Sequence, residues 1–199
     1  MATQPLYTQA NPVKGESSFL EAALAYISRG WAVFPIAPKS KTPMKGSKGF
    51  KEASKDTEQM RNWWKINPAA NIGIATGKIS GLFVVDLDNG AEGRASWAEL
   101  CRQQAQTQIN TLTTRTVSDG RHLLFTYPPG DIRLDCSAKV FPHIDTRGNG
   151  GYIVAPPSFV ITRESKGFYS WLNPGAPLAE MPAWLISAYQ GIITPPAAH

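Results

Sequence analysis

The alternation of apolar and polar residues divides the chain into short helices and strands, without an internal repeat. Apolar residues that recur at helical spacing predict amphipathic helices. These helices are expected from Ser18 to Gly30, from Asp56 or Thr57 to Asn67, from Ala91 to Gln106 and from Pro182 to Gly191. Runs rich in β-branched and aromatic residues predict strands. The strands are expected at residues 31–36, 72–75, 81–88, 112–117, 122–127, 143–147 and 152–155, with weaker candidates at 159–162 and 168–171.

Turn residues connect two pairs of these strands into predicted hairpins. Ser118-Asp119-Gly120 joins one pair, and Gly148-Asn149-Gly150-Gly151 is expected to fold strand 143–147 back against strand 152–155. Short antiparallel hairpins, with helices on the outside, indicate an α+β fold rather than an alternating parallel sheet.

The boundaries of the folded region follow from composition. Residues 1–16 are polar and lack periodicity, which predicts a loose tail. Residues 192–199 contain Pro195-Pro196 and are typical of a linker. We therefore expect residues 17–191 to form one domain of two closely packed lobes.

Composition narrows the class of protein. The chain has 199 residues, a formal net charge of +5 and a pI near 9.3, which suits a polyanionic partner. Cys101 and Cys136 lack the spacing of a disulfide framework or a zinc module, so a reducing cytoplasm is the expected location. An apolar run of the ~20 residues needed to span a bilayer is absent from the sequence, and no membrane association is expected.

Two acidic residues end the most apolar predicted strand, Gly81 to Asp88. Side chains alternate along a strand, so Asp86 and Asp88 share one face about 7 Å apart. Like charges this close raise each other's pKa unless an Arg or Lys, a shared proton or a divalent cation compensates them. Carboxylate oxygens suit Mg²⁺ or Mn²⁺, which commonly bind phosphates. The alternative is that the aspartates simply begin a loop, with Asn89-Gly90 as its turn.

Further polar residues stand at the ends of other predicted strands. His122 follows Gly120-Arg121, and Asp145 precedes Arg147 by two residues. Carboxylates that hold metal ions, together with cationic groups that bind a triphosphate, are what phosphoryl transfer requires.

A basic loop adds a candidate contact for nucleic acid. Between Lys39 and Lys55 there are six lysines and one acid, Glu52. Such a loop can follow a phosphate backbone, and Lys39, Lys41 and Lys45 are the candidate template contacts. A solvated surface loop is the alternative.

The ordered motifs resemble those of the bifunctional DNA primase/polymerase (prim-pol) domains of the archaeo-eukaryotic primase superfamily. The likeness covers about residues 18–190 and also includes Gly30-Trp31-Ala32-Val33-Phe34-Pro35. Its three motifs are Val84-Val85-Asp86-Leu87-Asp88, Gly120-Arg121-His122-Leu123-Leu124-Phe125, and the run from Asp145-Thr146-Arg147 through Gly148-Asn149-Gly150-Gly151 to Pro156-Pro157-Ser158. The resemblance implies an N-terminal αβ unit packed on an antiparallel-sheet unit like that of RNA-recognition motifs.

The resemblance also implies roles for individual residues. Asp86, Asp88 and Asp145 correspond to catalytic acids that bind Mg²⁺ or Mn²⁺, with a two-metal site expected. His122 corresponds to the histidine at the incoming nucleotide's phosphates. Arg121 and Arg147 are further phosphate contacts on charge and position, and Gly120 stands where many relatives have serine, so that only its backbone N–H can reach phosphate.

The resulting hypothesis is a primase/polymerase that transfers nucleotides from nucleoside triphosphates to a 3′ end on a single-stranded DNA template. Related domains often precede a helicase, as a further domain or a partner, and the resemblance suggests a phage or plasmid replicon. No GxxxxGK[ST] loop occurs in this chain. A non-catalytic single-stranded nucleic-acid-binding module and a metal-dependent nuclease are the alternatives.

Overall fold

The computed structural model describes residues 18–106 and 109–189, and the structural statements below concern these ranges. The predicted tail, the predicted linker and the helix stop at Gly191 lie outside them. The helices are α1 (Ser18–Ser28), the 3-10 helix η1 (Gly49–Glu52), α2 (Thr57–Ile66), α3 (Ala91–Gln103) and α4 (Ala183–Tyr189). The strands are β1 (Val33–Ile36), β2 (Asn71–Ala75), β3 (Leu82–Leu87), β4 (Thr113–Arg115), β5 (Arg121–Thr126), β6 (Ser137–Phe141), β7 (Ile144–Arg147), β8 (Tyr152–Ala155), β9 (Phe159–Ile161), β10 (Lys166–Phe168), β11 (Ser170–Trp171) and β12 (Ala179–Glu180).

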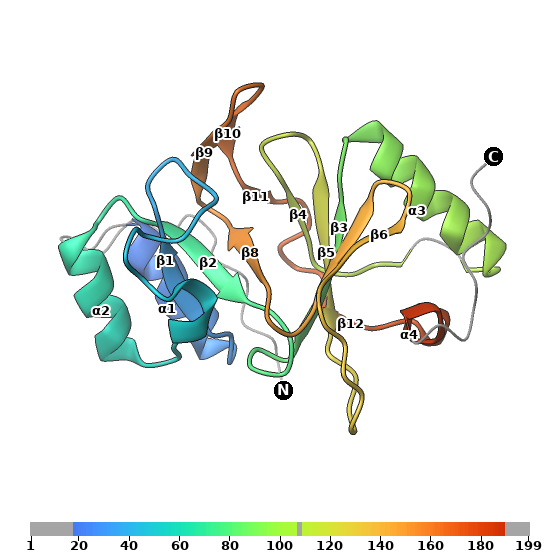
Figure 1. Ribbon diagram of the computed structural model, residues 1–199, viewed down its shortest axis with the longest axis horizontal. Coiled ribbons are helices and arrows are strands. Elements are labelled where there is room, and N and C mark those ends of the chain that lie inside the picture. Colours follow the sequence, from blue (N-terminus) through green and yellow to red (C-terminus); the bar gives the residue numbers. More distant parts are fainter. Residues whose placement is uncertain (1–17, 107–108, 190–199) are drawn as a thin grey trace.

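The strands form two sheets and a separate hairpin. The large sheet has the order β11-β4-β5-β3-β7-β6, with β12 added in parallel to β5. A smaller sheet, β1-β2-β8, is antiparallel throughout and lies beside α1 and α2 in Figure 1. Among the strands of the described ranges, β9 and β10 pair only with each other. The α+β fold expected from the sequence is confirmed.

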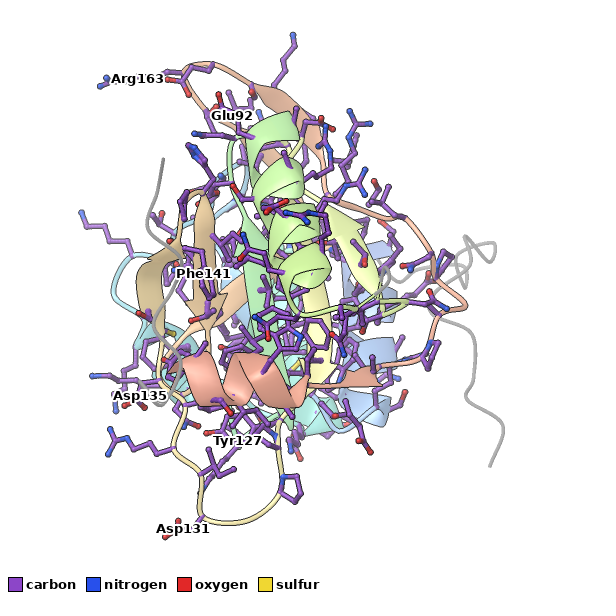
Figure 2. All side chains as sticks on the ribbon, turned by 90° about the vertical axis from the view of Figure 1, so that its right-hand side faces the viewer. Glu92, Tyr127, Asp131, Asp135, Phe141 and Arg163 are labelled. Atoms are coloured by element: carbon purple, nitrogen blue, oxygen red, sulfur yellow. The ribbon has the colours of Figure 1, made fainter. Side chains whose placement is uncertain are left out.

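The large sheet packs against other elements on both faces. Side chains on β3 and β5 alternate between these two faces. Leu82, Val84 and Leu124 pack on one face against α1, α2 and the small sheet. Phe83 and Phe125 pack on the other face under α3 and α4. Figure 2 looks onto α3 and α4, which lie in front of the strands. Residues that follow Val84 along the first face therefore emerge between the two sheets.

Local sequence determines where the helices begin and pack. The Asp56 carboxylate accepts a hydrogen bond of 2.7 Å from the backbone N–H of Gln59, which caps α2 as predicted. The buried Trp64 of α2 donates its indole N–H to the carbonyl of Ala70. This contact fixes α2 beside the start of β2.

The predicted hairpin of residues 143–147 with 152–155 is wrong. Strand β7 pairs with β3 and β6 in the large sheet, whereas β8 pairs with β2 in the small one. Strand β6, which the sequence reading missed, takes the place beside β7. The apolar side chains of β8 are buried on both faces. Ile153 and Ala155 pack in the core that contains Val84, whereas Val154 packs in a separate core with Phe34. Strand β8 is therefore held between two cores beside β2, rather than beside β7.

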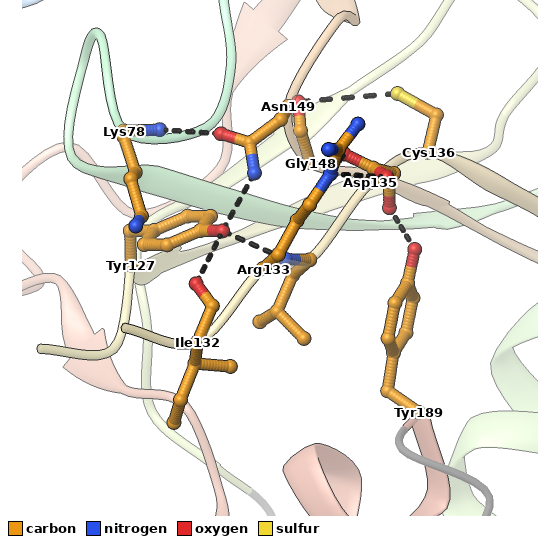
Figure 3. A network of polar contacts seen from close by, with 10 residues as sticks. Lys78, Tyr127, Ile132, Arg133, Asp135, Cys136, Gly148, Asn149 and Tyr189 are labelled. Carbon is orange, nitrogen blue, oxygen red and sulfur yellow. Dashed lines mark hydrogen bonds and ion pairs between the residues drawn. The ribbon is translucent and has the colours of Figure 1, made fainter. Parts of the chain in front are cut away.

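Asn149 explains why the Gly148–Gly151 segment crosses between sheets. Its side-chain oxygen accepts from the Lys78 N–H at 3.0 Å, its amide nitrogen donates to the Tyr127 hydroxyl at 2.7 Å, and its own N–H donates to the Leu134 carbonyl. The same tyrosine hydroxyl accepts from the Leu134 N–H and donates to the Ile132 carbonyl. Figure 3 shows this network, in which one asparagine joins the turns after β2, β5 and β7.

Gly77 provides the close approach that this network needs. Its φ is +87°, and a Cβ there would lie 2.4 Å from Asn149 Oδ1. We expect Gly77→Ala to lower the free energy of unfolding by about 3 kcal/mol, because a positive-φ penalty and an overpacking penalty add. Urea denaturation measures the loss.

Gly81→Ala is the matched control. Gly81 also has a positive φ, +64°, but a Cβ there meets no atom within 4 Å. Only the backbone penalty, about 1 kcal/mol, is expected. Equal losses in the two variants would show that the contact with Asn149 does not hold the sheets together.

Candidate active site

The register of three adjacent strands brings together residues that are far apart in the sequence. Strand β3 lies between β5 and β7, and Asp86 on β3 is directly opposite both His122 on β5 and Asp145 on β7. Directly opposite residues of antiparallel strands share a face, with Cβ atoms about 5 Å apart. The structure therefore groups one residue from each of the three sequence motifs.

Asp88 lies just beyond the end of β3. Its backbone N–H donates a 2.9 Å hydrogen bond to the His143 carbonyl, which extends the contact between β3 and the β7 side. Helix α3 begins close by, and a Cβ on Gly93 would lie 2.3 Å from the Asp88 carbonyl oxygen. The glycine lets α3 pack directly on the backbone that carries this carboxylate.

Arg147 bridges two of the three carboxylates. Its Nη2 lies 2.9 Å from Asp86 Oδ2 and 3.2 Å from Asp145 Oδ2, and its Nε lies 3.3 Å from the same Asp86 oxygen. The Asp86 side chain is only 11 % exposed, so its charge is largely shielded from water. One guanidinium thus compensates two carboxylates that lie opposite each other on β3 and β7.

The electrostatics of the site differ from residue to residue. Burial, followed by the charges of Asp86 and Asp145, raises the pKa of Asp88, while Arg147 and Lys41 oppose the shift. Burial lowers the pKa of His122, although the nearby Asp86 opposes this effect. The imidazole is therefore neutral at pH 7, with Nε2 3.5 Å from Asp86 Oδ1. Its buried Nδ1 has no hydrogen-bond partner in the described part of the chain.

A cleft of about 430 Å³ opens over these groups, between the two sheets. Asp86, Asp88, His122 and Arg147 line it, whereas Asp145 is connected to it through Arg147. Other lining residues escaped sequence reasoning because no motif spacing connects them to the acids. They include Thr116, Ser118, Cys136 and Tyr169.

The remaining candidate residues are divided between the cleft and other surfaces. Lys41 and Gly120 line the cleft, whereas Lys39 and Lys45 are exposed outside its lining. A Cβ on Gly120 would lie 2.6 Å from the Leu87 carbonyl, so close backbone packing explains this glycine.

Arg121 does not lie with the other candidate residues. It precedes His122 on β5, so strand alternation points it to the opposite face of the sheet. There it lines a separate pocket of about 810 Å³, beside Leu87 and Trp97. The expectation that Arg121 joins His122 at the phosphates is therefore corrected, because neighbouring residues in a strand point to opposite faces.

The donor groups suit a hard divalent cation in kind. Asp86 and Asp88 present carboxylate oxygens, the ligands that Mg²⁺ and Mn²⁺ prefer. In residues 18–106 and 109–189, however, no three Asp, Glu, His or Cys side chains are arranged to hold a metal ion. Arg147 already pairs with Asp86 Oδ2 at 2.9 Å. A cation bound at Asp86 would therefore have to compete with this guanidinium.

An α+β domain with acids, an imidazole and cationic groups around one cleft is suited to phosphate-bearing substrates. The sequence from residue 23 to residue 184 matches the family of bifunctional DNA primase/polymerase N-terminal domains, Prim-Pol. The chain belongs to this family. Its function is thus of the primase/polymerase, nucleotidyltransferase type, with DNA and nucleotides as the implied substrates. None of the curated proteins compared with the chain matches it.

Within the described residues, no helix is both long enough and apolar enough to cross a membrane.

Asp88 carries a charge that the folded state disfavours, and this has a measurable consequence. A raised pKa in the folded state means that ionised Asp88 destabilises the fold at pH 7. We expect Asp88→Asn to raise the melting temperature at pH 7 in metal-free buffer. The gain should disappear as the pH falls toward the ordinary value of 3.8, where wild-type Asp88 is protonated.

Thermal unfolding between pH 7 and pH 4 tests this expectation. Asp131→Asn is the control, because the Asp131 side chain is fully exposed in a loop away from the cleft. A lower melting temperature for Asp88→Asn at pH 7 would mean that Asp88 is a stabilising structural residue.

Proposed function

We propose that this domain catalyses template-directed nucleotidyl transfer in DNA replication, as a primase and polymerase. The observation that carries the proposal is the position of Asp86, opposite both His122 and Asp145, at a cleft that also contains Asp88, Arg147 and Lys41. Family membership supplies the reaction class, and this grouping supplies candidate residues for it.

In the proposed reaction, a 3′-oxygen attacks the α-phosphorus of an incoming nucleoside triphosphate. A new P–O bond forms, the bond to the β-phosphate oxygen breaks, and pyrophosphate leaves. Lys41 and Arg147 provide positive charge for the phosphates. Neutral His122 can donate a hydrogen bond from Nε2 to a phosphate oxygen at the floor of the cleft.

We further propose that Asp86, Asp88 and Asp145 hold Mg²⁺ or Mn²⁺ during the reaction. Bound there, the ions would neutralise phosphate charge and help to activate the attacking oxygen. Arg147 then has two roles, because it compensates Asp86 and Asp145 without metal and is free to contact phosphate when they bind a cation.

The same ion pairs favour a second candidate function. If Arg147 stays on Asp86 and Asp145, the acids are structural and the domain is a nucleic-acid-binding module without catalysis. This module would bind single strands in a salt-sensitive way without divalent metal, and would not incorporate nucleotides.

Nucleotide incorporation on primed and unprimed single-stranded DNA, with Mg²⁺ or Mn²⁺, tests the leading proposal. We expect Asp86→Asn to reduce the rate about a hundredfold or more, because it weakens the charge stabilisation on which the transition state depends. Asp131→Asn, a surface change, should retain the wild-type rate. Full activity in Asp86→Asn would reject the mechanism, and degradation of the template without nucleotides would indicate a nuclease.

Mn²⁺ binding tests the competition between Arg147 and the cation. We expect Arg147→Met to bind Mn²⁺ about tenfold more tightly in the absence of nucleotide, because a nearby positive charge is removed. Calorimetric titration measures the affinity, and nucleotide incorporation by the same variant should fall. Arg133→Met is the control, since Arg133 pairs with Asp135 at the surface. An unchanged Mn²⁺ affinity in Arg147→Met would show that the cation does not use these carboxylates.

A further inference from the structure

The β9–β10 hairpin exposes an apolar face that the fold does not use. Its register pairs Phe159 with Phe168 and Ile161 with Lys166, so these four side chains share one face. Phe168 is 63 % exposed and Ile161 is 48 % exposed. The rings of Phe159 and Phe168 contact each other with centroids 4.8 Å apart.

The opposite face of the hairpin anchors it to the protein. Val160 is buried in a core with Phe34, Ile36 and Tyr169. The hairpin is therefore held on one side by ordinary core packing. The aromatic pair on its other side contributes little to that core and is available for a ligand.

Backbone contacts join the hairpin to the basic loop that follows β1. Lys39 forms a bridge with Val160, and its carbonyl accepts a 2.9 Å hydrogen bond from the Ile161 N–H. The Asn71 side chain donates to the carbonyls of both Ser40 and Phe159. Figure 1 shows the loop and the hairpin side by side on the upper edge of the molecule. They form one surface.

This surface is strongly basic. In segments 37–48 and 159–168, the only acid is Glu164. Figure 2 shows Arg163 pointing outward at the hairpin tip. The exposed cations are Lys39, Lys41, Lys45, Lys48, Arg163 and Lys166.

The surface is continuous with the candidate active site. Lys41, in the basic loop, lines the cleft, so the surface reaches the cleft through this loop. Tyr169 also lines the cleft, but it does so from the anchored face of the hairpin, where it is buried with Val160. The Tyr169 ring lies 5.9 Å from the His122 ring, measured between centroids. A strand that continues from the hairpin along the basic loop would therefore lead toward the carboxylates.

We propose that the exposed face of the β9–β10 hairpin, together with Lys39, binds single-stranded nucleic acid. Bases stack on Phe168, while Lys166, Arg163 and Lys39 contact phosphates. Aromatic side chains beside a basic track bind single strands in this way, largely without regard to sequence. The excess of cations favours a polyanion over a second copy of this basic chain. Only the identification of the bound strand as the template rests on the proposed function.

Binding of a fluorescein-labelled oligo-dT in EDTA, without nucleotide, tests this inference through fluorescence anisotropy. We expect Lys166→Gln/Phe168→Ala to weaken binding about fivefold or more, since stacking on one aromatic ring and one phosphate contact are lost. The slope of log affinity against log salt should decrease by about 0.7. Phe168→Trp should retain wild-type affinity because it keeps an aromatic face, whereas Phe168→Leu should not.

The matched control is Lys65→Gln/Ile66→Ala. It also removes one lysine and one exposed apolar side chain, Ile66 being 74 % exposed, at the end of α2. Wild-type affinity is expected for this control. Equal affinities of Lys166→Gln/Phe168→Ala and the control would overturn the inference, as would a change in self-association, measured by sedimentation, without a change in DNA affinity.

The outcome is separable from that of the proposed function. Oligo-dT binding that depends on Phe168 but is accompanied by no nucleotide incorporation would reject the polymerase proposal and retain this one. Incorporation with no dependence of binding on Phe168 would do the reverse.

Discussion

The pairing register of β3 with β5 and β7 is the constraint on which the site depends. Backbone hydrogen bonding between these strands places Asp86 directly opposite His122 on β5 and Asp145 on β7, although the three residues are far apart in the sequence. A register shift of one residue would turn Asp86 to the other face. The like charges that this register brings together are costly when partly buried, and Arg147 compensates them from two residues beyond Asp145.

The rest of the fold holds this register and opens a cleft beside it. Leu82 and Val84 bury the start of β3 against α1, α2 and the small sheet. Only the end of the strand therefore reaches the space between the sheets. Asn149 ties the connection after β7 to the turns around Gly77 and Tyr127. The chain then crosses to β8 and returns through the β9–β10 hairpin to Tyr169. One continuous segment thus supplies Asp145, Arg147, one wall of the cleft and the aromatic hairpin of the basic surface.

Sequence reasoning predicted what depends on local pattern. The α+β class, the capped α2 and the strand that carries Asp86 follow from periodicity and turn chemistry, and the motif order indicated the family. The sequence did not predict the long-range strand pairing. The glycine-rich segment at 148–151 has the composition of a hairpin turn, and the crossing between sheets becomes visible only in the contacts of Asn149 and the burial of β8. Arg121 was grouped with His122 because strand alternation was not applied to that pair. Tyr169 carries no motif, so only the fold places it beside the imidazole.

We propose that Asp86, Asp88 and Asp145 converge on a cation during nucleotide transfer. A crystal structure with Mn²⁺ and a non-hydrolysable nucleoside triphosphate would show this, because anomalous scattering locates manganese independently of the refined coordinates. We expect a manganese peak about 2.1 Å from carboxylate oxygens of Asp86 and Asp88, with Arg147 turned from Asp86 toward phosphate. Nucleotide bound with Arg147 still paired to Asp86 and Asp145, and manganese absent from these carboxylates, would contradict it.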